Sequence, residues 1–216
     1  MLQLLETIKS RRSIRAFENN IPPKAIIQEC LEAATWAPSA TNQQPWEFIV
    51  LTGHALIKIN AIILEHFAER MQESTAFDSV PELLAARQQE IFASLMAAGD
   101  AAGIGANDIF QSSLRFFDAP IGVYFVTRKR SDNQYLLSTA AALENFLLAA
   151  HARGLGTCWL NVTVVCAEEI KQHLGIAADR ELVSGVALGY PAAGSPLNTF
   201  TRTRVPVNEV TTWLGF

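Results

Sequence analysis

The chain has 216 residues, a length that suits one domain or one domain with a sizeable insertion. Half of the residues are hydrophobic, only 18% are charged and the mean hydropathy is +0.17, so we expect part of the apolar surface to be covered in a subunit interface. The formal net charge of −4 argues against nucleic acid or an anionic membrane surface as a partner.

The first quarter of the chain predicts two helices and a strand. Apolar residues at helical spacing predict a short helix over residues 2–10. A proline pair is suited to start a second helix, which runs to about Trp36 and is stopped by Pro38. After a polar loop, the β-rich run at 46–52 predicts a buried strand.

The middle of the chain predicts two more helices and a second strand. Helical patterns cover residues 54–72 and a segment that begins at Pro81. Residues 99–108 are rich in glycine and alanine, which predicts a mobile loop. A strand is predicted at 120–127.

The next elements are a long helix, a strand and a short helix. Ser131 or Asp132 can cap the long apolar helix, which ends near His151. A third strand is predicted at 155–162 and a short helix at 167–174.

The C-terminal part predicts one strand and then little regular structure. The strand covers 182–190, the proline-rich segment 191–206 is expected to be extended, and a short final helix is expected at 207–214. Helices with scattered strands fit an α+β fold better than a regular alternation of the two. Because no repeat or linker divides the chain, we predict a single domain over residues 1–216.

The cysteines and the N-terminus indicate a cytoplasmic protein. The chain has three cysteines, Cys30, Cys158 and Cys166, without metal-binding spacing, which favours buried thiols in a reducing compartment. Charged residues interrupt the short apolar run at the N-terminus, so residues 1–15 predict neither a signal peptide nor a membrane anchor. The four histidines are widely spaced, so no metal site is expected.

Two arginine-rich segments are candidates for anion binding. In an extended RRSIR segment, Arg11, Ser13 and Arg15 point the same way and form a suitable receptor for a phosphate. The segment TRTR at 201–204 has the same period of two. Each could equally be a solvated basic loop, but two such clusters in an acidic chain are explained by one bound phosphate dianion.

Two further segments carry weaker signals. Residues 37–46 crowd amides and hydroxyls into one loop, which could bind a heterocycle edge or a polyol, or could be an ordinary helix–strand connection. Residues 154–161 hold two glycines but no dinucleotide-binding fingerprint, and Cys158 among them is interpreted as a packing residue. Glu144 on the long apolar helix either meets an arginine or lies on the exposed side.

In this order, the segments resemble the nitroreductase family of flavoproteins over nearly the whole chain. Only residues 66–112, interpreted as a variable helical or lid insertion, offer no matching motif. The matching motifs are RRSIRAF (11–17), APSATNQQPWEF (37–48), DAPIGVYFV (118–126), GLGTCWLN (154–161), ALGYP (187–191) and TRTRVPV (201–207).

The resemblance implies an architecture and an assembly. Such proteins are α+β three-layer sandwiches with a mainly antiparallel central sheet. They form intertwined homodimers in which a C-terminal extension, here 191–216, crosses to the partner. Two FMN molecules lie at the dimer interface and are touched by both subunits.

The resemblance also implies roles for individual residues. Leu160 and Asn161 would present backbone near the flavin N5, although many relatives have glycine after this strand where the present chain has Asn161 and Val162. The remaining contacts fall into three groups: Arg11, Arg12, Ser13 and Arg15 for the FMN phosphate and the ribityl chain or ring edge; Arg202 and Arg204 for the phosphate; and Pro38, Ser39, Ala40 and Asn42 from the other subunit against the isoalloxazine.

The implied activity is hydride transfer from NADH or NADPH, through FMN, to a small electron-poor acceptor such as a nitroaromatic or a quinone. Because the flavin carries the chemistry, no protein acid–base pair is expected, and the two substrates should react in turn by a ping-pong mechanism. Residues 99–117, with Phe110, Phe116 and Phe117, are a candidate lid over the substrate.

Three alternatives remain open from the sequence. The same flavin fold supports enone reduction, dehalogenation and dehydrogenation. A flavin-binding sensor or store would bind FMN without turnover. A plain apolar dimer with surface arginines would bind no flavin.

Overall fold

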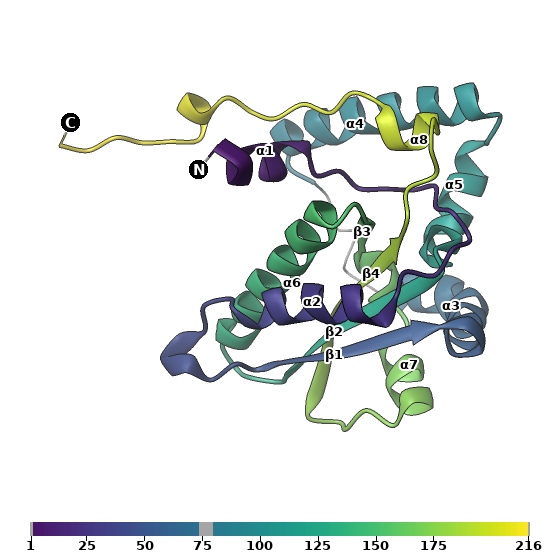
Figure 1. Cartoon of the computed structure of the whole chain (residues 1–216), viewed down its shortest axis with the longest axis vertical. Coiled ribbons are helices and arrows are strands. Elements are labelled where there is room, and N and C mark those ends of the chain that lie inside the picture. Colours follow the sequence, from purple (N-terminus) through teal and green to yellow (C-terminus); the bar gives the residue numbers. More distant parts are fainter. Residues whose placement is uncertain (1, 74–79, 216) are drawn as a thin grey trace.

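The computed structural model describes residues 2–73 and 80–215, and its centre is a four-stranded antiparallel sheet (Figure 1). The strand order is β1-β2-β4-β3, so the two central strands come from the middle and the end of the sequence. Strands β2 and β4 pair in register from Ile121–Leu188 onward, with one irregularity after Phe125. The strands are β1 (Trp46–Thr52), β2 (Ile121–Arg128), β3 (Gly156–Leu160) and β4 (Arg180–Gly189).

Helices account for most of the remaining chain. The helices are α1 (Leu2–Ser10), α2 (Lys24–Thr35), α3 (Gly53–Glu73), α4 (Glu82–Ala102), α5 (Ala106–Ser113), α6 (Gln134–Ala152), α7 (Ala167–Leu174) and α8 (Pro196–Thr199). Short 3₁₀ turns follow at η1 (Ala40–Asn42), η2 (Phe116–Asp118), η3 (Asn161–Val164) and η4 (Val207–Glu209). Within the described ranges, no helix is both long and apolar enough to cross a bilayer.

Strand β2 shows why the molecule has three layers. Seven of its eight residues are buried, so both faces of the sheet must be covered. Val123 and Phe125 pack in a core with α2 and α6, whereas Tyr124 and Val126 pack in a second core with α3 and α7. The predicted α+β sandwich with an antiparallel central sheet is therefore confirmed.

The predicted mobile loop at 99–108 is wrong. Helix α4 continues to Ala102 and α5 begins at Ala106, so only three residues connect them. Gly99 lies inside α4, where a Cβ would lie 2.6 Å from Ile109 Cδ1 and 2.8 Å from the Ile104 carbonyl oxygen. This glycine allows α5 to pack closely on α4 rather than ending the helix.

The C-terminal expectations also need correction. The segment 191–206 contains the one-turn helix α8, which begins with Pro196. The helix expected at 207–214 is reduced to the turn η4, and the segment projects from the body beyond α1 (Figure 1). Val207 and Val210 are exposed there, so their burial within the described part of the chain does not offset the cost of nucleating a short helix.

We predict that Gly99→Ala destabilises the protein by about 1–3 kcal/mol, because the added methyl group overpacks the α4–α5 contact. Intrinsic helix propensity alone would favour alanine by about 1 kcal/mol, so a loss of stability identifies the packing effect. Urea unfolding measures the difference. Gly105→Ala is the matched control, since a Cβ at Gly105 meets only Asp108 Oδ2 at 3.5 Å. Equal stability of the two variants would contradict this interpretation.

Candidate functional site

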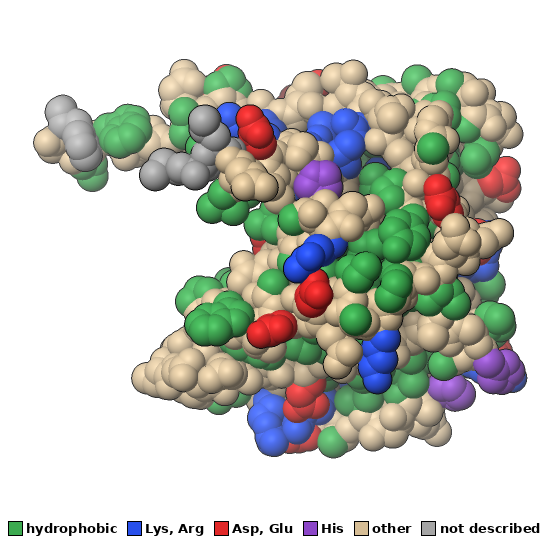
Figure 2. Space-filling model, viewed as in Figure 1, with side chains coloured by type: hydrophobic (Ala, Val, Ile, Leu, Met, Phe, Trp, Pro, Cys, Tyr) green, Lys and Arg blue, Asp and Glu red, His purple; other side chains and the backbone are tan. Residues whose placement is uncertain are grey.

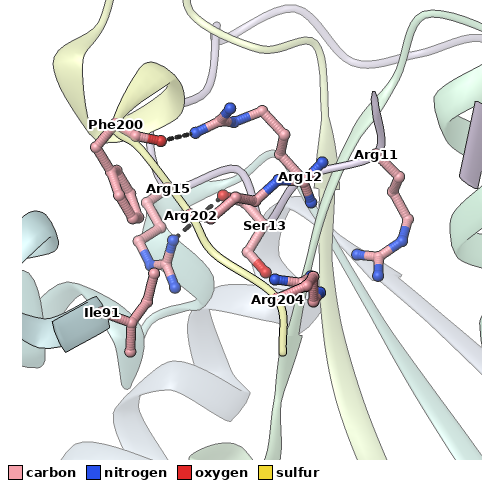
Figure 3. Close-up of a pocket in the computed structure, with 8 residues that line it drawn as sticks. All are labelled: Arg11, Arg12, Ser13, Arg15, Ile91, Phe200, Arg202 and Arg204. Atoms are coloured by element: carbon pink, nitrogen blue, oxygen red, sulfur yellow. Dashed lines mark hydrogen bonds between the residues drawn. The ribbon is translucent and has the colours of Figure 1, made fainter. Parts of the chain in front are cut away.

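The two arginine segments predicted from the sequence meet in one pocket (Figure 3). The segment that follows α1 supplies three arginines and Ser13, and the segment after α8 supplies two arginines and Phe200. The lining residues are Arg11, Arg12, Ser13, Arg15, Ile91, Phe200, Arg202 and Arg204. Two segments almost 190 residues apart in sequence thus form one cationic surface.

The charge of this pocket is not balanced by its walls. Among the described residues that line it, every charged side chain is an arginine. Burial and then the charges of Arg12, Arg204 and Arg11 lower the pKa of Arg202. Such like-charge crowding is relieved by an anion, and guanidinium groups match phosphate oxygens in geometry and charge.

Arg11 lines the pocket and also contacts an acidic residue on α6. Its Nε lies 3.4 Å from Glu144 Oε1, which confirms the interpretation of Glu144 as an acid that meets an arginine. The same Nε is buried and forms no hydrogen bond within the described residues. Glu144 therefore offsets part of the charge of Arg11, whereas the other arginines of the pocket have no acidic residue among the described lining residues.

Asn198 joins the two arginine segments. This residue is 6% exposed, and its Oδ1 accepts hydrogen bonds from the backbone N–H groups of Arg15 and Ala16 at 2.9 and 3.1 Å. Its Nδ2 donates to the carbonyl oxygens of Ala16 and Ala192 at 2.8 and 3.3 Å. The side chain therefore acts as a bridge that holds the first segment against the second.

Phe200 contributes a second neutral contact between the segments. Its ring centroid lies 5.8 Å from Arg12 Cζ and 5.4 Å from Arg15 Cζ. Arg12 also donates a hydrogen bond to the Phe200 carbonyl oxygen. Cation–π contacts of this kind let one aromatic ring orient two guanidinium groups.

A second cavity adjoins the arginine pocket and is mainly apolar. It has a volume of about 440 Å³, within the usual range for small-molecule sites. Arg15 lines both cavities, so they share a wall. The other lining residues are Phe92, Leu95, Met96, Ala106, Ile109, Phe110, Ser113, Phe117, Trp159, Leu160, Asn161 and Val162.

Turn η2 places one aromatic ring in this cavity and one in the core. Phe116, Phe117 and Asp118 all have positive φ, between 52° and 56°, which is a strained conformation for residues other than glycine. Phe116 is completely buried, so its prediction as a lid residue is wrong. Phe110 and Phe117 line the cavity.

The remaining candidate residues fall in two places. Leu160 and Asn161 lie at the end of β3 and line the apolar cavity. The loop with Pro38, Ser39, Ala40 and Asn42 lies at the other end of the molecule, where the neighbouring Gln43 accepts a hydrogen bond from Tyr135 at 2.6 Å. Within one chain, the structure does not bring this loop to the arginine pocket.

Several site residues were not identified from the sequence. Phe200 directly precedes the TRTR segment, and this position in the sequence could have indicated that it belongs to the pocket. Asn198 and Trp159 carry no distinguishing pattern, because their importance depends on contacts between distant segments. Cys158 is buried and, as expected, is a packing residue whose thiol pKa is raised by burial. No group of three or more potential metal ligands occurs in the ranges 2–73 and 80–215.

Comparison with known proteins identifies the family. The profile of the nitroreductase family matches residues 8–190. This chain belongs to the nitroreductase family. A nitrobenzene nitroreductase from Ectopseudomonas oleovorans is 30% identical over 220 residues, covering 97% of this chain and 96% of that protein. A chloronitrobenzene nitroreductase from Comamonas testosteroni is 29% identical over 217 residues, covering 97% and 96%.

Solved structures agree with the fold. The FMN and NADPH-dependent nitroreductase NfnB from Sphigopyxis sp. strain HMH superposes with a TM-score of 0.89 at 24% identity, covering 99% of each chain. A nitroreductase with bound FMN from Bacteroides fragilis superposes with a TM-score of 0.68 at 25% identity, covering 98% of this chain and 99% of that one. The family predicted from the order of motifs is confirmed.

The lowered pKa of His151, a residue close to two arginines of the pocket, predicts that the stability of the protein depends on pH. Its Nε2 lies 2.8 Å from Ser10 Oγ, and burial, with the charges of Arg11 and Arg202, lowers its pKa from the usual 6.5. The unfolded chain therefore binds the proton first, so the free energy of unfolding should fall as the pH decreases below 6.5. Urea unfolding at low ionic strength between pH 5 and pH 8 measures this slope.

Two variants isolate the contribution of this histidine. His151→Gln should flatten the slope, whereas His173→Gln, which changes an exposed histidine, should leave it unchanged. Sulfate should also reduce the slope in the original protein, because a dianion in the pocket offsets the charges of Arg11 and Arg202. The same slope with and without His151 would refute the assignment.

Proposed function

We propose that this chain is an FMN-dependent oxidoreductase that transfers hydride from NADH or NADPH to nitroaromatic, quinone or similar electron-poor acceptors. The observation that carries the proposal is the uncompensated arginine pocket, which shares Arg15 with a mainly apolar cavity. A molecule with a phosphate at one end and a planar ring at the other fits this pair of sites. The nitroarene-reducing activities in the names of the two relatives support the acceptor class.

The residues present fit FMN in charge and in hydrogen-bonding capacity. The phosphate would be held by Arg11, Arg12, Arg202 and Arg204, whose guanidinium groups supply N–H donors to its oxygens. Ser13 and Arg15 would hold the remaining phosphate oxygens or the ribityl chain. The charge-assisted hydrogen bonds would both bind the cofactor and relieve the repulsion among the arginines.

FMN, when bound, would supply the hydride-transfer chemistry, and the protein would supply orientation and electrostatics. Arg15 places a positive charge at the wall between the two cavities, where it stabilises negative charge that develops on reduction. Phe92, Phe110 and Phe117 line the ring-sized space and give it apolar walls. If the nicotinamide and the acceptor share this cavity, they would bind in turn, which would give ping-pong kinetics.

We also propose that the functional unit is a homodimer. A groove lined by residues of α1, α2 and α6 includes Leu4 and Trp36, and Trp36 is 81% exposed. Figure 2 shows the molecule hollowed between the projecting C-terminal segment and the body, with hydrophobic side chains at its border. A second copy would cover this surface with its own segment 191–216, and its Pro38, Ser39, Ala40 and Asn42 would reach the flavin.

An anaerobic titration tests the proposed activity directly. The purified protein with bound FMN should lose its absorption near 450 nm on addition of NADH or NADPH, and nitrobenzene or 4-nitrobenzoate should restore it. Parallel lines in double-reciprocal plots would support the ping-pong order. A flavin that neither nicotinamide bleaches would overturn the reductase assignment and favour a sensor or store.

The arginine assignment predicts the effect of Arg204→Ala on FMN affinity. Loss of one charge-assisted hydrogen bond should weaken binding by about 1.5–3 kcal/mol, roughly a 10- to 150-fold increase in Kd. Fluorescence titration of the apoprotein with FMN measures this change. Arg128→Ala is the control, because Arg128 is exposed and pairs with Asp179 away from the pocket. An unchanged Kd for Arg204→Ala would exclude this residue from the phosphate site.

A further inference from the structure

Asn161 is held in one orientation by two neighbours. Its Oδ1 accepts a hydrogen bond from Trp159 Nε1 at 2.7 Å and from Ser184 Oγ at 2.9 Å. Trp159 belongs to β3 and Ser184 to β4, so the amide is fixed to two paired strands. Ser184 is completely buried, which makes its side of this contact rigid.

The chemistry of the indole determines which end of the amide faces Trp159. An indole N–H can only donate a hydrogen bond, so the atom 2.7 Å from it must be the amide oxygen. Ser184 alone would not fix this orientation, because a hydroxyl group can either donate or accept. Trp159 is therefore the residue that determines the direction of the amide.

The other end of the amide is the part available to a ligand. Asn161 lines the apolar cavity together with Arg15 and Phe117. Its Nδ2 donates no hydrogen bond to a protein acceptor within residues 2–73 and 80–215. Because both contacts engage its oxygen, this side chain can donate to a molecule in the cavity but is not free to turn and accept from one.

We propose that Trp159 and Ser184 lock Asn161 as a donor-only contact to the flavin N5, and that this lock lowers the reduction potential of the bound flavin. The inference rests on the proposed function, since it requires FMN in the cavity. Oxidised N5 accepts a hydrogen bond, whereas N5 after reduction carries a hydrogen and donates. A fixed N–H donor is thus satisfied only by the oxidised form, and the reduced flavin becomes the stronger reductant.

The lock has a consequence for the acceptors that the enzyme can reduce. A lower potential increases the driving force for hydride transfer to acceptors that are difficult to reduce, of which nitroarenes are one class. An amide free to rotate would turn its oxygen toward the reduced N5 and cancel this effect. Trp159 and Ser184 are therefore positioning residues that act through Asn161.

The decisive variant is Trp159→Phe, which keeps an aromatic ring and removes the donor that orients Asn161. Trp159 is 39% exposed, so the substitution should not prevent folding. Without the indole N–H, the Ser184 hydroxyl can either donate to the amide oxygen or accept from the amide nitrogen of Asn161. The amide can then adopt either orientation. The midpoint potential of bound FMN should rise by about 30 mV, which corresponds to a tenfold change in the ratio of reduced to oxidised FMN affinity for a two-electron couple.

A double-mutant cycle with Asn161→Ala separates the lock from a direct effect of the ring. Asn161→Ala should raise the potential in the same direction, and adding Trp159→Phe to it should cause no further rise. A shift from Trp159→Phe that persists unchanged without Asn161 would overturn the lock. So would an unchanged potential in Trp159→Phe, even if the variant had a lower thermal midpoint, because that pattern indicates a purely structural contact.

The outcomes also separate this inference from the proposed function. If the original protein retains no FMN, or its FMN is reduced by neither nicotinamide, the proposed function fails and the lock fails with it. If the original protein binds and reduces FMN normally while the variants keep its potential, only the lock is refuted. The potentials are measured on the flavin itself by its absorption during anaerobic redox titration, so no acceptor is needed.

Discussion

Repulsion among five guanidinium groups is the constraint around which both ends of the chain are organised. The arginines converge from segments near each terminus, and no acidic residue described at the pocket lining neutralises them. Neutral contacts bring the segments together instead: Asn198 forms three hydrogen bonds to the backbone of Arg15 and Ala16, and Phe200 lies near Arg12 and Arg15. Glu144 on α6 meets only Arg11. Neutral contacts therefore hold the two arginine segments together. The positive charge of the arginines remains available to bind an anionic ligand.

Packing in the core holds a strained turn beside the same site. The left-handed backbone of η2 costs on the order of 1–3 kcal/mol per residue and persists only where the surroundings impose it. Phe116 provides that restraint, since glycines on the two central strands make room for its ring. A Cβ at Gly185 would lie 3.0 Å from Phe116 Cε1, and one at Gly122 would lie 3.2 Å from the same atom. Burial of Phe116 therefore directs Phe117 to the cavity wall near Arg15.

The sequence was sufficient to predict features that depend on local pattern. The period of two in RRSIR and TRTR predicted a phosphate-sized cluster, and hydrophobic periodicity located the four strands and most helices. Features that depend on contacts between distant segments were not accessible in this way. Gly99 was misread as part of a loop because its close contact with Ile109 exists only after folding. The orientation of Asn161 likewise depends on Ser184, which antiparallel pairing brings near it.

The length of α6 provides an argument that one subunit holds an incomplete flavin site. Tyr135, in the first turn, fixes the loop next to Asn42 through Gln43, whereas His151, in the last turn, contacts Ser10 beside the arginine pocket. At 1.5 Å per residue these two turns are about 24 Å apart, so α6 keeps the loop and the arginine pocket of one chain well separated. The proposed homodimer would overcome this separation if its two-fold axis brought the partner's loop to this chain's pocket. If Asn42 contacts flavin, association of two subunits is therefore a requirement of cofactor binding and not merely a way to cover Trp36.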